Sequence, residues 1–160
     1  MYDYQIDSSR ENTDMVMHDM AGHLIRRLHQ QSTQLFAQRT QAAGYDLTSV
    51  QYAALDAIAN NPHVDQASVA EIIGYDRATI GGVIERLDTK GWVRRVVNEQ
   101  DRRSRELSLT AKGNKIYLAL QPIVHALQAD ILHPLSAAEQ ERFIKLARQV
   151  VWHDKSADKA

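Results

Sequence analysis

Apolar residues recur every three or four positions in some parts of the chain and every second position in others. The first helical pattern covers residues 13–43, which hold no proline and end before Gly44. A helix of about thirty residues is about 45 Å long, which is more than one small domain needs to cover. We therefore expect part of its apolar stripe to pack on a second chain. The stripe comprises Met17, Ala21, Leu24, Leu28, Ser32 and Leu35.

Capping residues mark where the other helices begin. Residues 47–60 open with the T-x-x-Q spacing of a capping box and end at an Asn-Pro pair. Residues 110–132 carry an apolar seam in which Pro122 should bend the helix. A second capping box, S-x-x-E, opens the last helix. The expected helix starts are Thr48, Asp65, Asp76, Thr110 and Ser136.

Two short helical patterns in residues 65–89 have the spacing of helices that cross over a tight turn. Ala70 is small enough for close approach, and Gly74 supplies a turn with positive φ. Ile80 and Val83 bury the second of the two helices. This pattern predicts a helix-turn-helix.

Period-two runs at residues 92–97 and 105–109 then predict a two-stranded ribbon around a charged loop. Its apolar positions are Val93, Val96, Val97, Leu107 and Leu109, and Val64 is a candidate third strand. A helix-turn-helix followed by such a ribbon is a winged helix, whose second helix can enter a major groove while the loop reaches the minor groove. The fold class is therefore mainly α, with a small α+β lobe. We expect one domain over residues 1–160, with the DNA-binding lobe at 47–110 and dimerisation helices at 13–43 and 111–154.

Charge is unevenly distributed along the chain. The whole sequence has a net charge of −1, but residues 77–105 hold eight basic and four acidic side chains, a net charge of +4. Residues 1–20 are net −4. The basic segment coincides with the predicted winged helix, as phosphate binding requires.

The expected DNA contacts lie on the outward side of the second helix and along the wing. Thr79 could meet base edges or a phosphate, and Gly82 costs about 1 kcal/mol in a helix, which makes sense if the backbone must approach DNA. Arg86 could instead pair with a neighbouring acid, and one ribbon arginine could pair with Glu99 or Glu106. The candidates are Arg77, Thr79, Gly82, Arg86, Arg94, Arg95, Asp101, Arg102, Arg103 and Arg105.

Wing specificity depends on the loop. Asp101 stands two residues before Arg103, where a carboxylate can hold a guanidinium in one orientation. Arg102 or Arg103 would enter the minor groove, and the sequence does not choose between them. Arg94, Arg95 and Arg105 suit phosphate contacts.

Several function classes find no support in the sequence. The chain has no cysteine, no long apolar run, and no P-loop, G-x-S-x-G or G-x-G-x-x-G motif. Its seven histidines include no pair at i, i+4 spacing. We therefore expect no enzyme, no resident metal or other cofactor, no membrane partner, and a cytoplasmic location.

The ordered set of motifs in residues 47–113 resembles the MarR family of bacterial transcriptional regulators. The matching pieces are Leu47-Thr48, Gln51-Tyr52, Val69-Ala70-Glu71, Gly74, Thr79-Ile80, Val83-Ile84, Arg86-Leu87, Lys90-Gly91, Asp101-Arg102-Arg103, Leu109-Thr110 and Lys112-Gly113. The resemblance implies a homodimer whose terminal helices interlock. It also implies a repressor that binds a double-stranded, pseudo-palindromic operator and is released by a small aromatic carboxylate or phenolic effector. The implied effector pocket would draw on His23, Arg26, Arg27, Tyr52 and Tyr117.

Three readings compete with this one. A winged helix can serve protein contacts alone, and the regulator could respond to a metal ion or to pH instead of an aromatic compound. Tyr52 could belong to the core, and Arg26 and Arg27 could be solvated or pair with the partner chain. Whether the protein represses or activates depends on where its operator lies.

Overall fold

The computed structural model describes residues 17–97 and 105–152. The fold is mainly helical with one antiparallel two-stranded sheet, which confirms the expected class. The elements in chain order are a 3-10 helix at Met17–Asp19, α1 Ala21–Ala42, α2 Ser49–Asn60, α3 Gln66–Ile73, α4 Arg77–Thr89, β1 Val93–Val97, β2 Arg105–Leu109, α5 Ala111–Ile131 and α6 Ala137–Val151. None of the helices in these residues is long and apolar enough to cross a membrane.

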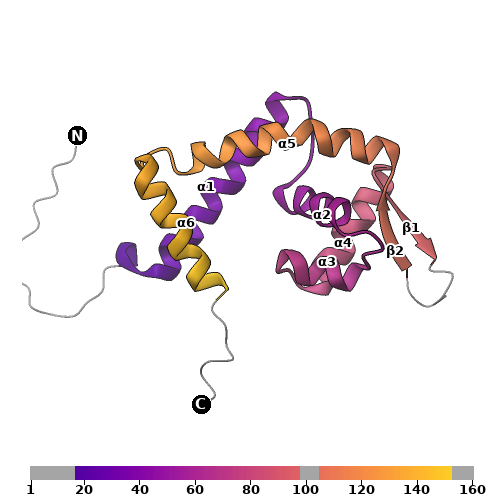
Figure 1. The fold of residues 1–160 in the computed structure, drawn as a ribbon, viewed down its shortest axis with the longest axis horizontal. Helices are drawn as coiled ribbons and strands as arrows, with labels where there is room; N and C mark the ends of the chain where they lie inside the picture. The colour runs from indigo at the N-terminus through magenta and orange to yellow at the C-terminus, as the bar shows by residue number, and fades with distance from the viewer. Residues whose placement is uncertain (1–16, 98–104, 153–160) are drawn as a thin grey trace, which may run out of the picture.

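A compact lobe holds α2, α3, α4 and the ribbon, and α5 runs from the ribbon to α6 across the top of Figure 1. The centre of the lobe is apolar: Leu55, Ile80, Ile84 and Leu87 are fully buried. These side chains come from α2 and α4, so the inward face of α4 is fixed against the lobe. Its opposite face is left for solvent or a partner.

The expected turns and caps are present. Gly74 has φ 71°, and Tyr75 N–H donates to the Ala70 carbonyl across the turn. The Asp65 carboxylate accepts from Ser68 N–H at 2.7 Å, which caps α3. Thr48 opens α2 with the reciprocal pair of bonds of a capping box. These short-range signals set the helix boundaries in the lobe.

Only some of the apolar side chains of the ribbon are buried. β1 pairs with β2 in the register Val93↔Leu109 to Val97↔Arg105. Of the apolar positions named for β1, Val93 is buried, whereas Val96 and Val97 are 41% and 54% exposed. Figure 1 shows this end of the ribbon projecting away from the helices of the lobe. The candidate third strand at Val64 is reduced to one bond from Leu107 N–H to the Val64 carbonyl, beside a single bridge at Asp65.

The first turn of α5 lies unusually close to the chain before β1. A Cβ on Gly113 would stand 1.9 Å from the carbonyl oxygen of Trp92. The Thr110 hydroxyl donates to the Gly91 carbonyl at 2.7 Å and accepts from Gly113 N–H at 3.0 Å. This junction joins the wing to α5, and only glycine fits it without backbone movement.

The long N-terminal helix starts later than expected. Of the predicted residues 13–43, the structure describes a 3-10 turn and then α1 from Ala21, with Met20 extended and without a side-chain cap. Gly22 in the first turn weakens helix propensity there. Residues 13–16 lie outside the described part of the chain.

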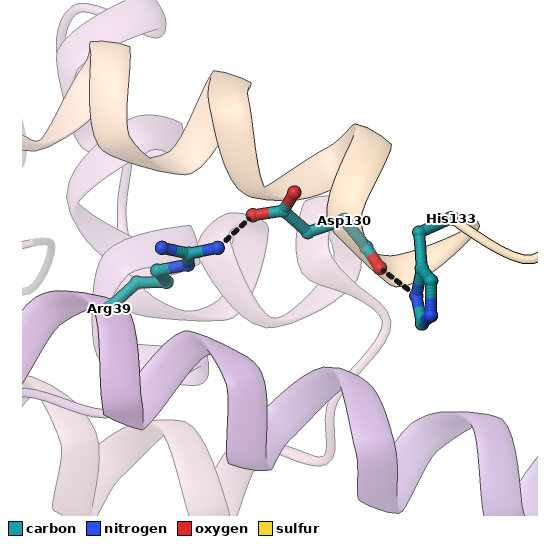
Figure 2. Close-up of polar contacts among 3 residues, drawn as sticks. All are labelled: Arg39, Asp130 and His133. Carbon is teal, nitrogen blue, oxygen red and sulfur yellow. Dashed lines mark hydrogen bonds and ion pairs between the residues drawn. The ribbon is translucent and has the colours of Figure 1, made fainter.

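The C-terminal half of α1 packs on α5. Figure 2 shows an ion pair between Arg39 and Asp130, with Nη2 and Oδ2 2.5 Å apart. His133 Nδ1 lies 3.0 Å from the backbone carbonyl oxygen of Asp130 at the end of α5. The carbonyl accepts, so the histidine nitrogen is the donor of this hydrogen bond. Both charged side chains are about half exposed, so the pair links α1 to α5 but contributes little free energy.

Helix α6 is uncovered. Its capping box at Ser136 and Glu139 forms as expected, yet no residue of α6 is buried by the described part of the chain. Val150, Val151 and Trp152 are 74%, 69% and 70% exposed. An apolar stripe of this size in solvent indicates a surface made to be covered.

Candidate nucleic-acid interface

The N-terminus of α4 carries a rigid polar pair. The Asp76 carboxylate accepts from Thr79 N–H at 2.8 Å through Oδ1, and from the Thr79 hydroxyl at 2.5 Å through Oδ2. The bond from the Thr79 hydroxyl, followed by the bond from its backbone N–H, holds the pKa of Asp76 below its usual value. Both residues are exposed, so the pair lies on the surface of the lobe.

The two arginines expected on α4 are available for contacts. Arg77 and Arg86 are exposed. The alternative for Arg86 was an ion pair with Glu85 or Asp88, and no such pair forms in the region that the structure describes. Both guanidinium groups can therefore reach a phosphate or a base edge.

The two glycines of α4 differ in what surrounds them. A Cβ on Gly81 would stand 3.3 Å from Gln66 Nε2, so this glycine accommodates α3. A Cβ on Gly82 would meet nothing within 4 Å. Nothing in the described fold requires a glycine at position 82, which is consistent with the expectation that the backbone there approaches DNA.

The ribbon supplies part of the expected basic surface. Arg94 and Arg95 are exposed on β1, and Arg94 Nε donates to the Ser108 hydroxyl at 2.9 Å. Arg105 pairs through its backbone with Val97. The loop candidates Asp101, Arg102 and Arg103 lie outside the described residues, as does Glu99.

One wing contact was missed at the sequence level. His63 has φ 64°, and its Nδ1 lies 2.7 Å from Glu106 Oε2 on β2. This pair ties the loop between α2 and α3 to the base of the wing. Histidine tolerates the left-handed region better than most residues, but no sequence signal links positions 43 residues apart.

Lys90 also has a structural role that its charge did not reveal. Its Nζ donates to the Asp46 carbonyl and lies 4.8 Å from the centre of the Trp92 ring. Lys112 Nζ donates to the Lys90 carbonyl at 3.1 Å. The lysine thus belongs to the junction between α4 and α5.

The candidate effector residues form two separate groups in this chain. Tyr52 stacks on Tyr117 with ring centres 5.9 Å apart and meets Phe36 of α1 at 6.1 Å. Arg27 precedes Phe36 by nine residues, which is about 14 Å along the helix. The basic group therefore does not reach the tyrosines within one chain.

Each group has its own internal contacts. The Tyr117 hydroxyl donates to Asp56 Oδ1 at 2.8 Å and accepts from Asn60 and Gln121 at 3.2 and 2.9 Å. That hydroxyl is saturated beside a carboxylate, a poor position for an anion. In the first turns of α1, Arg26 Nη2 lies 3.5 Å from His23 Nδ1. Desolvation, followed by the charge of Arg26, lowers the pKa of His23.

Comparison with known proteins decides the family. Residues 45–104 match the model of the MarR family. The regulator HosA of Escherichia coli is 36% identical over 137 residues, which cover 86% of this chain and 98% of HosA. The chain belongs to the MarR family. It is a DNA-binding transcriptional regulator and not an enzyme.

Solved structures of MarR-family regulators agree with this fold. PcaV of Streptomyces coelicolor in complex with its natural ligand is 34% identical, with a TM-score of 0.78 over 88% of this chain and 97% of PcaV. BpsR of Bordetella bronchiseptica, whose DNA binding is regulated by 6-hydroxynicotinic acid, is 26% identical, with a TM-score of 0.77 over 84% and 94% of the two chains. The likeness extends beyond the lobe to the terminal helices.

Proposed function

We propose that this MarR-family regulator is a homodimeric repressor that binds a pseudo-palindromic operator and releases it on binding a small aromatic acid. The observation that carries the DNA part is the free outer face of α4. Its inner face is buried through Ile80 and Ile84, while Arg77 and Arg86 stand exposed without a described ion pair. Such a face suits insertion into a major groove.

The dimer part of the proposal is supported by the chain ends. Leu24 and Ile25 on α1 and Val150 and Val151 on α6 are exposed apolar residues far from the lobe in sequence. A two-fold dimer that buried them would place two copies of α4 about one turn of duplex apart, about 34 Å. The operator would then contain two inverted half-sites.

The effector part is supported by chemistry near the N-terminus and by one relative. His23, Arg26 and Arg27 place cationic and donor groups on one end of α1. The compound that regulates BpsR, 6-hydroxynicotinic acid, is an aromatic carboxylate with a ring hydroxyl. We expect the basic group to bind the carboxylate, with an apolar slot from the partner's helices around the ring.

A mobility-shift assay on the DNA upstream of the protein's own gene tests the DNA part and the effector part. Retarded DNA that is released by one member of a panel of hydroxybenzoates, cinnamates and 6-hydroxynicotinic acid is the expected result. The neutral amide of the same ring is the matched control and should not release the DNA. Arg26→Gln should weaken release without weakening DNA binding.

Other outcomes would change the proposal in separable ways. Tight binding that no aromatic acid relieves would remove the effector and keep the regulator. Absence of any shift at low salt would contradict DNA recognition at this site and favour a winged helix used for protein contacts.

A further inference from the structure

The hydroxyl proton of Thr79 is already committed within the protein. Thr79 Oγ1 lies 2.5 Å from Asp76 Oδ2, and the other carboxylate oxygen accepts the backbone N–H of Thr79. A hydroxyl has one proton to donate and two lone pairs that accept. The direction of this bond therefore decides what Thr79 can offer to a third group.

The direction follows from the charge of Asp76. An ionised carboxylate only accepts hydrogen bonds, so the proton in the bond must come from threonine. An aspartate with its ordinary pKa is already ionised at neutral pH, and the same two bonds lower the pKa of Asp76 further. Thr79 is exposed, and because its proton is committed to Asp76, its hydroxyl oxygen can only accept from a further group.

Such an oxygen selects among the groups on DNA. Phosphate oxygens are acceptors and offer it nothing, and the nearby Asp76 carboxylate repels them. In the major groove guanine presents only the acceptors N7 and O6, whereas adenine N6 and cytosine N4 carry amino donors. Of the two contacts that the sequence left open for Thr79, a base edge is therefore favoured over a phosphate.

We propose that Asp76 is a positioning residue that makes Thr79 an acceptor, so that Thr79 reads the exocyclic amino group of adenine or cytosine in each half-site. The inference rests on the proposed insertion of α4 into the major groove. Asp76 acts through Thr79 and needs no contact with DNA. Its replacement should change which base is preferred, beyond any change in overall affinity.

The isosteric change Asp76→Asn gives a test with a predicted sign. Asparagine is as good an N-cap as aspartate. Its Oδ1 must still accept from Thr79 N–H, which turns Nδ2 toward the hydroxyl. The amide then donates to Thr79 Oγ1 and frees the threonine proton to point outward. Thr79 becomes a donor, and the preferred base should change to one with an acceptor, guanine or thymine.

The experiment starts from duplexes randomised over about two helical turns. Wild-type protein selects a bound duplex, and every base pair of that duplex is then replaced by the other three. At one position in each half-site we expect wild type to favour adenine or cytosine over guanine by about threefold to tenfold, the range for one net hydrogen bond. Asp76→Asn should reverse that preference and leave the other positions unchanged.

Three controls separate polarity from charge and folding. Asp65→Asn makes the same change at the cap of α3, where the carboxylate accepts from Ser68 N–H, and should alter affinity equally for all duplexes. Thr79→Val should abolish the preference, and Asp76→Asn should add no base-specific effect in that background. If the preferred base is adenine, a duplex with 2-aminopurine at that position should bind as weakly as one with guanine, because the analogue moves the amino group to the minor groove. If the preferred base is cytosine, this adenine analogue gives no information of that kind and should have no effect.

The outcomes are distinguishable. A uniform change of affinity in Asp76→Asn, with the base profile of wild type, would overturn the inference while the regulator remains. An unchanged profile in Thr79→Val would do the same. Failure of the wild-type protein to retain any duplex would overturn the proposed function, and this inference with it.

Discussion

The DNA-binding lobe and the terminal helices treat their apolar residues in opposite ways. In the lobe, Leu55 and Ile84 are fully buried by residues of the same chain. Val150 in the last turn of α6 and Trp152 just after that helix are 74% and 70% exposed, although the helix has a well-formed N-terminal capping box. The apolar residues of the lobe are buried by side chains of the same chain, whereas those at the end of α6 are left exposed by the described residues. We therefore expect folding of the lobe and the proposed dimerisation to depend on separate parts of the chain.

The largest effect should come from charging the uncovered helix. We expect Leu146→Asp with Val150→Asp to weaken dimerisation by about 3–6 kcal/mol per chain, or about 6–12 kcal/mol per dimer, because each side chain contributes about 1.5–3 kcal/mol when buried. Sedimentation equilibrium would measure it. Operator affinity should fall with the dimer.

The matched control lies in the lobe. Ile72 on α3 is 52% exposed, close to the 50% of Leu146, and Ile72→Asp should leave the dimer intact. Equal weakening of the dimer by both changes, or no change of mass in the α6 variant, would contradict the proposal that α6 forms the dimer interface and the lobe does not.

A single methyl group should damage the lobe nearly as much. We expect Gly113→Ala to lower the free energy of unfolding by about 3 kcal/mol, the upper part of the range for overpacking, because the added Cβ would stand 1.9 Å from the Trp92 carbonyl oxygen. Urea denaturation followed by circular dichroism would measure the loss. A change of only a few tenths would show that the junction can relax.

The wing should contribute to DNA binding without affecting assembly. Arg103→Ala is expected to weaken operator binding by about 1–3 kcal/mol, because it removes a minor-groove or phosphate contact. Lys159→Ala, in the polar tail, should have no effect. Fluorescence anisotropy with labelled operator would measure both. An unchanged affinity in Arg103→Ala, with the dimer mass also unchanged, would refute the assignment of the wing.

A smaller effect should distinguish stability from function in α4. Gly82→Ala is expected to raise the free energy of unfolding by about 1 kcal/mol, since alanine is the better helix former and a Cβ there meets nothing. Operator affinity should fall if the backbone approaches the DNA. Thermal unfolding and anisotropy on one preparation would show both; a variant that is more stable and binds as wild type would remove Gly82 from the interface.

The smallest effect concerns the aromatic contact between α1, α2 and α5. Burial, followed by Tyr117 and Asp56, raises the pKa of Tyr52 to about 12 from 10.0. A raised pKa means stability that is present below pH 10 and lost as the pH rises toward 12. Burial also raises the pKa of Tyr117, so titration of tyrosinate absorbance should show late protons from both tyrosines, of which Tyr52→Phe removes one. Titration of all tyrosines near their ordinary value would contradict this burial.

Local chemistry could be predicted from the sequence, and long-range contacts could not. Thr48, Asp65 and Gly74 act on atoms within four or five residues, so their patterns were sufficient. The closeness of Gly113 to Trp92 and the pairing of His63 with Glu106 depend on how whole elements pack. The same holds for the saturated hydroxyl of Tyr117, which joins α5 to α2.

The surplus length of residues 13–43 predicted some exposed apolar surface, but the sequence did not identify which side chains would remain exposed. The apolar stripes of α1 and α6 predict buried faces, but a stripe does not say whether the same chain or another covers it. The candidate effector residues show the same limit. His23 and Arg27 were grouped with Tyr52 by resemblance, yet the length of α1 separates them within one chain.

The central claim is that two copies of this chain, joined through their terminal helices, bind one operator. Mass measurement of the complex with a selected duplex, by analytical ultracentrifugation with absorbance for DNA and protein, tests it most directly. We predict two chains per duplex and a sequence with two inverted half-sites. One chain per duplex, or a dimer that binds no duplex even at low salt, would contradict the claim.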